Sequence, residues 1–189
     1  MVPEWRLDTQ AKYRLTLTSN SQHLLRLNVG FIIHESVGYS RDFPFELPSI
    51  TLKPDLDLVD LSGVARVTRT QQGLLVQVMM TAATACECVR CLDDFFQPLK
   101  IDFVELYAFT PNSQTESGLM VPETGLLDLE PLVREEMLLA IPINPICRPD
   151  CKGLCPVCGE NLNESHCSHE DEEVDPRLSV LKTLLNKDG

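Results

Sequence analysis

Cysteines at short spacings are the side chains of this sequence best suited to chemistry. Cys88 and Cys91 form one pair separated by two residues. A denser group follows, and it consists of Cys147, Cys151, Cys155 and Cys158. Thiolates at these spacings can reach a single ion, and zinc takes four such ligands in tetrahedral geometry. The pattern therefore predicts structural Zn²⁺ binding, with these six cysteines as the candidate ligands.

The string Cys155-Pro-Val-Cys158-Gly159 has the features of a metal knuckle. Glycine after the second thiol permits positive φ, so that turn amides can point at the sulfurs. Cys147 and Cys151 are close enough in sequence to supply two further ligands. The arrangement ranked first is therefore a local site of all four cysteines, which would order a segment too poor in apolar residues to fold alone.

The sequence leaves the role of Cys88 and Cys91 open. The pair can share an ion with Cys155 and Cys158, which is the arrangement ranked second, or it can remain free. It can also belong to a second site, for which the further candidate ligands are Cys86, Cys167, His166 and His169. We expect Cys86 itself to be a small buried hydrophobic residue rather than a ligand.

Other thiol chemistries are weighed against zinc. A redox dithiol is disfavoured because neither Cys-x-x-Cys pair precedes a helix in a βαβ unit. Iron–sulfur clusters also use four thiolates, but the Cys-Pro-x-Cys-Gly knuckle is more typical of zinc. A hydrolytic zinc site needs an open position and usually His or carboxylate ligands. The sequence shows no phosphate-binding loop, serine elbow or catalytic carboxylate pair, so we expect no enzyme.

The charge of the chain is strongly asymmetric. The 189 residues carry a net charge of −12. Residues 1–100 contain 10 basic and 11 acidic side chains, whereas residues 101–189 contain 6 and 17. An acidic half repels phosphate and attracts basic proteins. With no apolar stretch long enough to cross a bilayer and no apolar signal core, we expect a soluble protein of a reducing compartment.

The first half of the chain predicts β-strands. Polar and apolar residues alternate over residues 13–18, and residues 24–33 form another β-like run. Three later segments, residues 63–70, 74–85 and 99–109, predict an antiparallel meander in which alternate side chains face a core. The inward-facing residues are expected to be Leu74, Val76, Val78, Met80, Leu99, Ile101, Phe103, Tyr107 and Phe109.

Helices are expected only after the strands. Asp128 is the expected N-cap of a helix with Pro131 in its first turn, and Pro142 and Pro145 stop it. Its apolar face consists of Leu129, Leu132, Val133, Met137 and Ala140. A short helix is expected to begin at Asp175. The fold class is therefore α+β. Residues 1–140 form a β-rich domain with one C-terminal helix, and residues 141–189 form a cysteine-rich metal-binding segment packed on it.

The chain resembles the YceD family, the large ribosomal RNA subunit accumulation proteins of bacteria and plastids. The matching motifs are Cys88-Val-Arg-Cys91-Leu92, an acidic helix running into Ile141-Pro142, the string Cys151-Lys-Gly-Leu-Cys155-Pro-Val-Cys158-Gly-Glu-Asn161-Leu-Asn163, and Asp175-Pro-Arg-Leu178. The resemblance implies a non-enzymatic factor that supports accumulation of large-subunit ribosomal RNA, in the bacterial cytoplasm or the plastid stroma.

Charge and resemblance together suggest a partner. We expect the acidic half to bind a basic ribosomal protein or a large-subunit assembly intermediate, so that contact with ribosomal RNA is indirect and no membrane is involved. The alternative is a direct RNA-binding zinc module. It requires the basic residues Arg66, Arg69, Arg90, Lys100, Arg148 and Lys152 to form a coherent surface.

Overall fold

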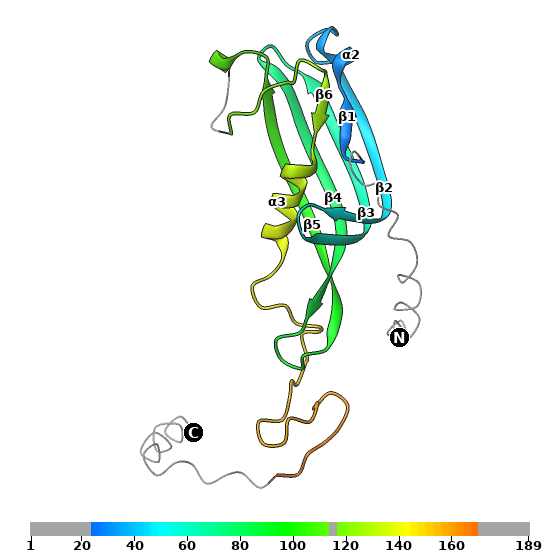
Figure 1. The fold of residues 1–189 in the computed structure, drawn as a ribbon, viewed down its shortest axis with the longest axis vertical. Helices are drawn as coiled ribbons and strands as arrows, with labels where there is room; N and C mark the ends of the chain where they lie inside the picture. Colours follow the sequence, from blue (N-terminus) through cyan, green and yellow to red (C-terminus); the bar gives the residue numbers. More distant parts are fainter. Residues whose placement is uncertain (1–23, 114–116, 170–189) are drawn as a thin grey trace, which may run out of the picture. The chain divides into compact units, whose positions relative to one another are not determined.

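The computed structural model describes residues 24–113 and 117–169 (Figure 1). The chain divides into two compact units. The first consists of the residues up to Cys86 together with Phe96–Ile143. The second consists of Glu87–Phe95 together with the residues from Asn144 onward. The short segment around Cys88 and Cys91 therefore belongs to the cysteine-rich unit, although it lies between two strands in sequence.

A four-stranded sheet forms the first unit. Its strands are β2 (Ser40–Leu52), β3 (Leu56–Arg69), β4 (Gly73–Glu87) and β5 (Asp94–Ala108), and they are neighbours in that order. β2 pairs antiparallel with β3, and β3 with β4. The short connection between β4 and β5 makes the last pairing antiparallel as well. The predicted meander is confirmed, with one strand more than the sequence indicated.

One face of this sheet carries the core. Along β4, the side chains of Leu74, Val76, Val78 and Met80 are almost fully buried, as their alternation predicted. Leu99, Ile101 and Tyr107 of β5 are buried with them, and Phe103 and Phe109 pack against the same core. The period of two therefore identified the inward face of both strands correctly.

A helix and a small ladder cover that face. β1 (Arg26–Asn28) pairs antiparallel with β6 (Leu126–Asp128), and α3 (Glu130–Ala140) follows directly (Figure 1). The buried side chains of Leu129, Val133 and Met137 belong to the same core as the strand residues. Leu132 and Ala140 pack at its edge. The expected apolar face of this helix is confirmed, and so is its end before Pro142.

Some expectations need correction. Residues 31–33 are not extended; they lie in the short helix α2 (Gly30–Ile33). The N-cap of α3 is Leu129 rather than Asp128, although the Asp128 carboxylate accepts a hydrogen bond from the Glu130 amide at 3.0 Å. The loop after β5 contains a 3-10 turn, η1 (Pro111–Ser113). The strand expected at residues 13–18 and the helix expected at Asp175 lie outside the described residues.

The α+β class is confirmed: the structure is mostly antiparallel sheet with few helices and a cysteine-rich segment near its C-terminus. Within the described residues, no helix is long and apolar enough to span a membrane.

Candidate metal centres

A tight loop between β4 and β5 presents the first pair of thiols. The loop is closed by backbone hydrogen bonds in both directions: the Cys88 amide donates to the Asp93 carbonyl, and the Leu92 amide to the Cys88 carbonyl, each at 2.9 Å. A third bond joins the loop to the later segment, from the Val89 amide to the Pro145 carbonyl at 3.0 Å. The backbone therefore fixes the loop beside the residues that lead to Cys147.

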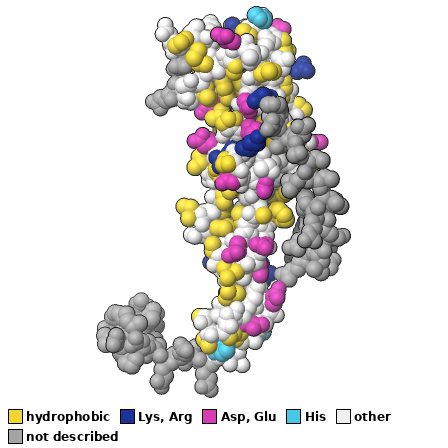
Figure 2. Space-filling view, viewed as in Figure 1, with side chains coloured by type: hydrophobic (Ala, Val, Ile, Leu, Met, Phe, Trp, Pro, Cys, Tyr) yellow, Lys and Arg dark blue, Asp and Glu magenta, His cyan; other side chains and the backbone are white. Residues whose placement is uncertain are grey.

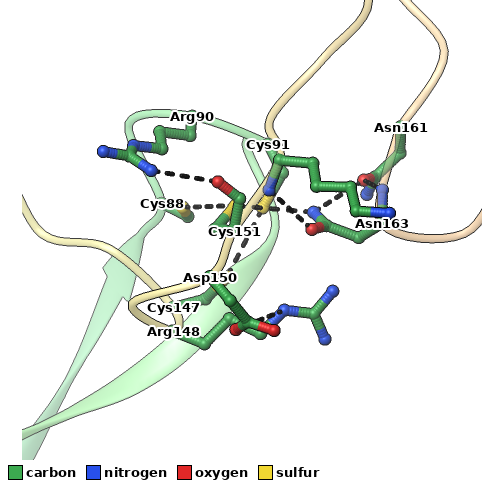
Figure 3. A network of polar contacts seen from close by, with 10 residues as sticks. Cys88, Arg90, Cys91, Cys147, Arg148, Asp150, Cys151, Asn161 and Asn163 are labelled. Carbon is green, nitrogen blue, oxygen red and sulfur yellow. Dashed lines mark hydrogen bonds and ion pairs between the residues drawn. The ribbon is translucent and has the colours of Figure 1, made fainter.

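Four thiols meet at this loop. The sulfurs of Cys88, Cys91, Cys147 and Cys151 all lie within 4.8 Å of one another (Figure 3). The Cys88 and Cys151 sulfurs are 3.9 Å apart, and those of Cys91 and Cys147 are 3.6 Å apart. Four sulfurs at about 2.3 Å from a tetrahedral ion would be about 3.8 Å from one another. The set therefore has the dimensions of a four-thiolate metal site, which we call the tip cluster.

The tip cluster is largely buried. Cys88 is completely buried, Cys91 and Cys151 are each 3% exposed, and Cys147 is half-buried. Phe95 packs against them. Among the described residues of the cysteine-rich unit, the buried hydrophobic side chains are all cysteines. The thiols themselves thus occupy the place of an aliphatic core.

The environment divides the four thiols into two kinds. Burial opposes ionisation of Cys88, but backbone hydrogen bonds from Cys147, Cys91 and Arg90 outweigh it and lower the pKa of Cys88 to about 6. A hydrogen bond from the Asn163 side chain lowers the pKa of Cys151. Burial raises the pKa of Cys91 and of Cys147. Donors thus already favour two thiolates, and a bound cation would favour ionisation of the other two.

Two asparagines support the tip cluster from outside. The Asn163 amide donates to the Cys151 sulfur at 3.4 Å, and its carbonyl oxygen accepts from the Lys152 amide at 2.9 Å (Figure 3). Asn163 also donates to the Asn161 side chain at 2.9 Å, and Asn161 donates to both carboxylate oxygens of Asp93. This chain of bonds joins the segment after the knuckle to the loop that carries Cys88 and Cys91.

Hydrogen bonds that involve the backbone also join the segment of Cys151 and Leu154 to the loop of Cys88 and Cys91. The Leu154 amide donates to the Arg90 carbonyl at 3.0 Å, and the Arg90 guanidinium donates to the Cys151 carbonyl at 3.0 Å. Gly153 has φ +78°, and a Cβ at this position would lie 3.0 Å from the Arg90 carbonyl oxygen. Only glycine allows this close approach without strain.

The knuckle cysteines belong to a second group. Cys155, Cys158, Cys167 and His169 have ligand atoms that lie within 4.8 Å of one another, and we call this set the knuckle cluster. The sulfurs of Cys158 and Cys167 are 3.5 Å apart. Cys155 is buried, Cys158 and His169 are exposed, and Cys167 is half-buried.

The six cysteines predicted as ligands therefore lie in two groups. This arrangement is neither the local four-cysteine site nor the site shared by the Cys88 and Cys155 pairs, which were the two preferred predictions. Cys147 and Cys151 lie with Cys88 and Cys91, and Cys155 and Cys158 lie with Cys167 and His169. Cys86 belongs to the first unit, is half-buried and enters neither group found among the described residues. Asn161 and Asn163 were not identified as supporting residues, although both stand in the string that carries the resemblance.

Three basic residues of the alternative proposal already have partners within their own unit. Arg66 pairs with Asp42 at 2.6 Å, and Arg148 lies 3.5 Å from Asp150. Arg69 donates to backbone carbonyls and stacks over the Phe109 ring, 4.4 Å from its centroid. On the face drawn in Figure 2, basic side chains are interspersed with acidic ones.

Comparisons with known proteins agree with these motifs. A family model described as "Large ribosomal RNA subunit accumulation protein YceD" matches residues 76–185. An uncharacterized protein of Mycobacterium tuberculosis is 36% identical over 166 residues, which are 84% of this chain and 76% of the relative. The uncharacterized protein YlbN of Bacillus subtilis is 33% identical over 103 residues, which are 53% of this chain and 60% of YlbN.

A plant relative carries a functional name. The Arabidopsis thaliana protein called "Large ribosomal RNA subunit accumulation protein YCED homolog 1, chloroplastic" is 41% identical over 63 residues, which are 33% of this chain and 20% of that protein. No solved structure matches the chain significantly. The family match covers the loop with Cys88 and Cys91 as well as the later cysteines, and on that ground the chain belongs to the YceD family.

Proposed function

We propose that this protein is a non-enzymatic factor that supports accumulation of large-subunit ribosomal RNA, and that zinc bound by the tip cluster holds its cysteine-rich unit together. The family name supports the process, since it describes an RNA accumulation protein. The observation that carries the structural role is the closed set of four thiols, three of them almost fully buried. A closed all-thiolate set is typical of structural zinc and leaves no position for a substrate.

Zinc is the ion that fits these donors best. Magnesium and calcium prefer oxygen ligands, whereas thiolates select softer ions. Cys88 and Cys91 come from one loop and Cys147 and Cys151 from another, so an ion bound to all four would cross-link two distant parts of the chain. Elemental analysis of protein purified without added metal tests this assignment. Recovery of iron with a visible iron–sulfur absorption would contradict it.

The same burial argues against a dithiol oxidoreductase. A redox thiol must be reached by its substrate, and reactive cysteines lie in partly exposed sites. Cys88 is completely buried and Cys91 is 3% exposed. This pair is placed to hold an ion rather than to exchange disulfides.

The proposed partner is a basic ribosomal protein or a large-subunit assembly intermediate. A groove along α3 supports this proposal because acidic and apolar side chains lie together there. Its lining consists of the acidic Asp128, Glu130 and Glu135, the apolar Pro131, Leu138 and Leu139, and the basic Lys53 and Arg134. Asp128 already pairs with Arg26, and Arg134 with Asp55 outside the groove, so Glu130 and Glu135 are the carboxylates proposed to meet a basic partner. Leu138 is 39% exposed and Leu139 is 75% exposed. A basic amphipathic segment would bury the leucines and pair with the carboxylates.

Affinity purification from a bacterial extract tests the partner. Tagged full-length protein is incubated at moderate salt, with and without nuclease, and bound proteins and RNA are identified. We expect basic large-subunit proteins to remain after nuclease treatment, and Glu135→Lys to reduce their recovery. Glu46→Lys is the matched control, since Glu46 is exposed on β2 and alternates with the inward-facing Phe45. Recovery of RNA without any ribosomal protein would contradict the proposal and favour the RNA-binding alternative.

A further inference from the structure

We propose that the knuckle cluster, Cys155, Cys158, Cys167 and His169, is a second metal site that takes a soft divalent cation, with Zn²⁺ the best fit. The protein then holds two ions of different coordination, a buried four-thiolate ion and a more exposed ion with three thiolates and one imidazole. Three thiolates and one histidine form a common structural zinc set.

The distances carry the first part of the argument. The one ligand atom that each of the four residues offers lies within 4.8 Å of those of the other three. The Cys158 and Cys167 sulfurs are 3.5 Å apart, close to the separation of about 3.8 Å expected for thiolates on one tetrahedral zinc. All the cysteines involved are free thiols. Soft donors gathered at this separation, and not joined as a disulfide, match the ligand set of a soft cation.

The backbone around Cys155 already has the conformation that a metal knuckle needs. The Gly159 amide donates to the Cys155 carbonyl at 2.9 Å, and the Cys155 amide donates to the Glu160 carbonyl at 2.8 Å. A bridge between Leu154 and Asn161 closes the turn. Gly159 has φ +74°, and a Cβ added there would have no atom within 4 Å, so the turn depends on backbone conformation and not on packing. The turn thus places Cys155 and Cys158 side by side as two ligands.

The two clusters differ in their access to solvent. In the tip cluster three of four ligands are almost fully buried, whereas in the knuckle cluster Cys155 alone is buried and Cys158 and His169 are exposed. A chelator or an incoming ligand can approach an exposed thiolate and replace it. The ion in the knuckle cluster is therefore expected to exchange first, in a separate and faster phase.

Metal stoichiometry of the full-length protein tests the proposal directly. Protein purified under reducing conditions is analysed for bound metal, and the same protein is titrated with Co²⁺ after metal removal. We expect two equivalents in the wild type and one in Cys158→Ala and in His169→Ala. The Co²⁺ spectra should contain two components, of which these variants lose the same one. Cys86→Ser is the control, because Cys86 lies in neither cluster, and it should keep two equivalents.

The effects of these variants can be distinguished from those of disrupting the tip cluster. Cys158 and His169 are exposed, so their replacement should leave amide protection of the Cys88 loop unchanged, which hydrogen exchange can verify. One equivalent in the wild type that both variants retain would overturn the proposal; one equivalent that both variants lose would support this site and contradict the zinc of the tip cluster. The proposal would also be overturned if both variants kept two equivalents, or if mass analysis of unreduced protein showed a disulfide between Cys158 and Cys167 with a single ion bound. Each result that overturns the second site leaves an ion that does not depend on Cys158 or His169, as the zinc proposed for the tip cluster requires.

Discussion

The side-chain amide of Asn163 donates a hydrogen bond to the Cys151 sulfur, 3.4 Å away. The bond lowers the pKa of Cys151, whose sulfur lies within 4.8 Å of those of Cys88, Cys91 and Cys147. Partners of this kind contribute strongly to metal affinity, because they hold a ligand in place before the ion arrives.

We expect Asn163→Ala to weaken metal binding at the tip cluster about tenfold or more. Competition with a chromophoric chelator measures the affinity. Asn112→Ala is the control, since Asn112 is an exposed amide in η1 of the first unit. Equal affinity of the Asn163 variant and the wild type would show that the hydrogen bond does not contribute.

Loss of the tip cluster should unfold one unit and spare the other. We expect Cys88→Ser to lose the ion and the amide protection of residues 144–169, because the buried hydrophobic side chains described in this unit are cysteines. The sheet should persist, because the main core lies entirely in the first unit.

Far-UV circular dichroism and hydrogen exchange distinguish the two units in this experiment. Cys86→Ser provides the matched control, as it changes a neighbouring cysteine that belongs to neither cluster. A complete loss of β-sheet signal in Cys88→Ser would mean that the two units fold as one.

Gly153→Ala should destabilise the cysteine-rich unit by about 1–2 kcal/mol, through backbone strain and contact with the Arg90 carbonyl. The contact would lengthen the bond from the Leu154 amide to that carbonyl. Gly159→Ala is the matched control, because its φ is similar but no atom lies near the added methyl group. Faster exchange of the Leu154 amide in the Gly153 variant alone would confirm the role of the close approach, and equal exchange in both would contradict it.

Packing of α3 on the sheet can be tested with two residues of the same helix. Met137 is fully buried, and we expect Met137→Ala to reduce the free energy of unfolding by about 2–5 kcal/mol. Leu139 is 75% exposed, so Leu139→Ala should change it by no more than about 0.5 kcal/mol. Urea denaturation measures both. Similar values for the two variants would contradict the burial of Met137 in this core.

Periodicity explains which parts of the fold were predictable. In β4 the strict alternation of Leu74, Val76 and Val78 with less buried residues identifies both the strand and its inward face. β2 was not predicted from the sequence, because Pro44 and Pro48 interrupt its strand-like pattern. It is an edge strand, where a residue without an amide donor is tolerated. Residues 31–33 were assigned wrongly because three apolar residues fit a strand or a buried helical turn equally well.

The cysteines that could serve as ligands can be named from the sequence, but the sequence does not show which of them lie together. A Cys-x-x-Cys spacing determines that two thiols can share an ion, because that geometry is local. Which pairs meet depends on the path of the backbone. Here it is set by bonds such as those from the Val89 amide to Pro145 and from the Leu154 amide to Arg90, which no spacing in the sequence reveals.

The tip cluster can assemble only late in synthesis of the protein, because its four cysteines come from two distant parts of the chain. Cys88 and Cys91 precede β5, β6 and α3 in the chain, and Cys147 and Cys151 follow them. During synthesis, the four thiols of the tip cluster therefore cannot meet until the ribosome has made β5, β6 and α3. Synthesis proceeds at about 5–20 residues per second, and the sheet can fold as it leaves the ribosome. During that time Cys88 and Cys91 are present without Cys147 and Cys151. With the proposed ion, metal binding would be the last step in folding of the cysteine-rich unit, and a chain that ended before Cys151 would lack the fourth thiol of the tip cluster.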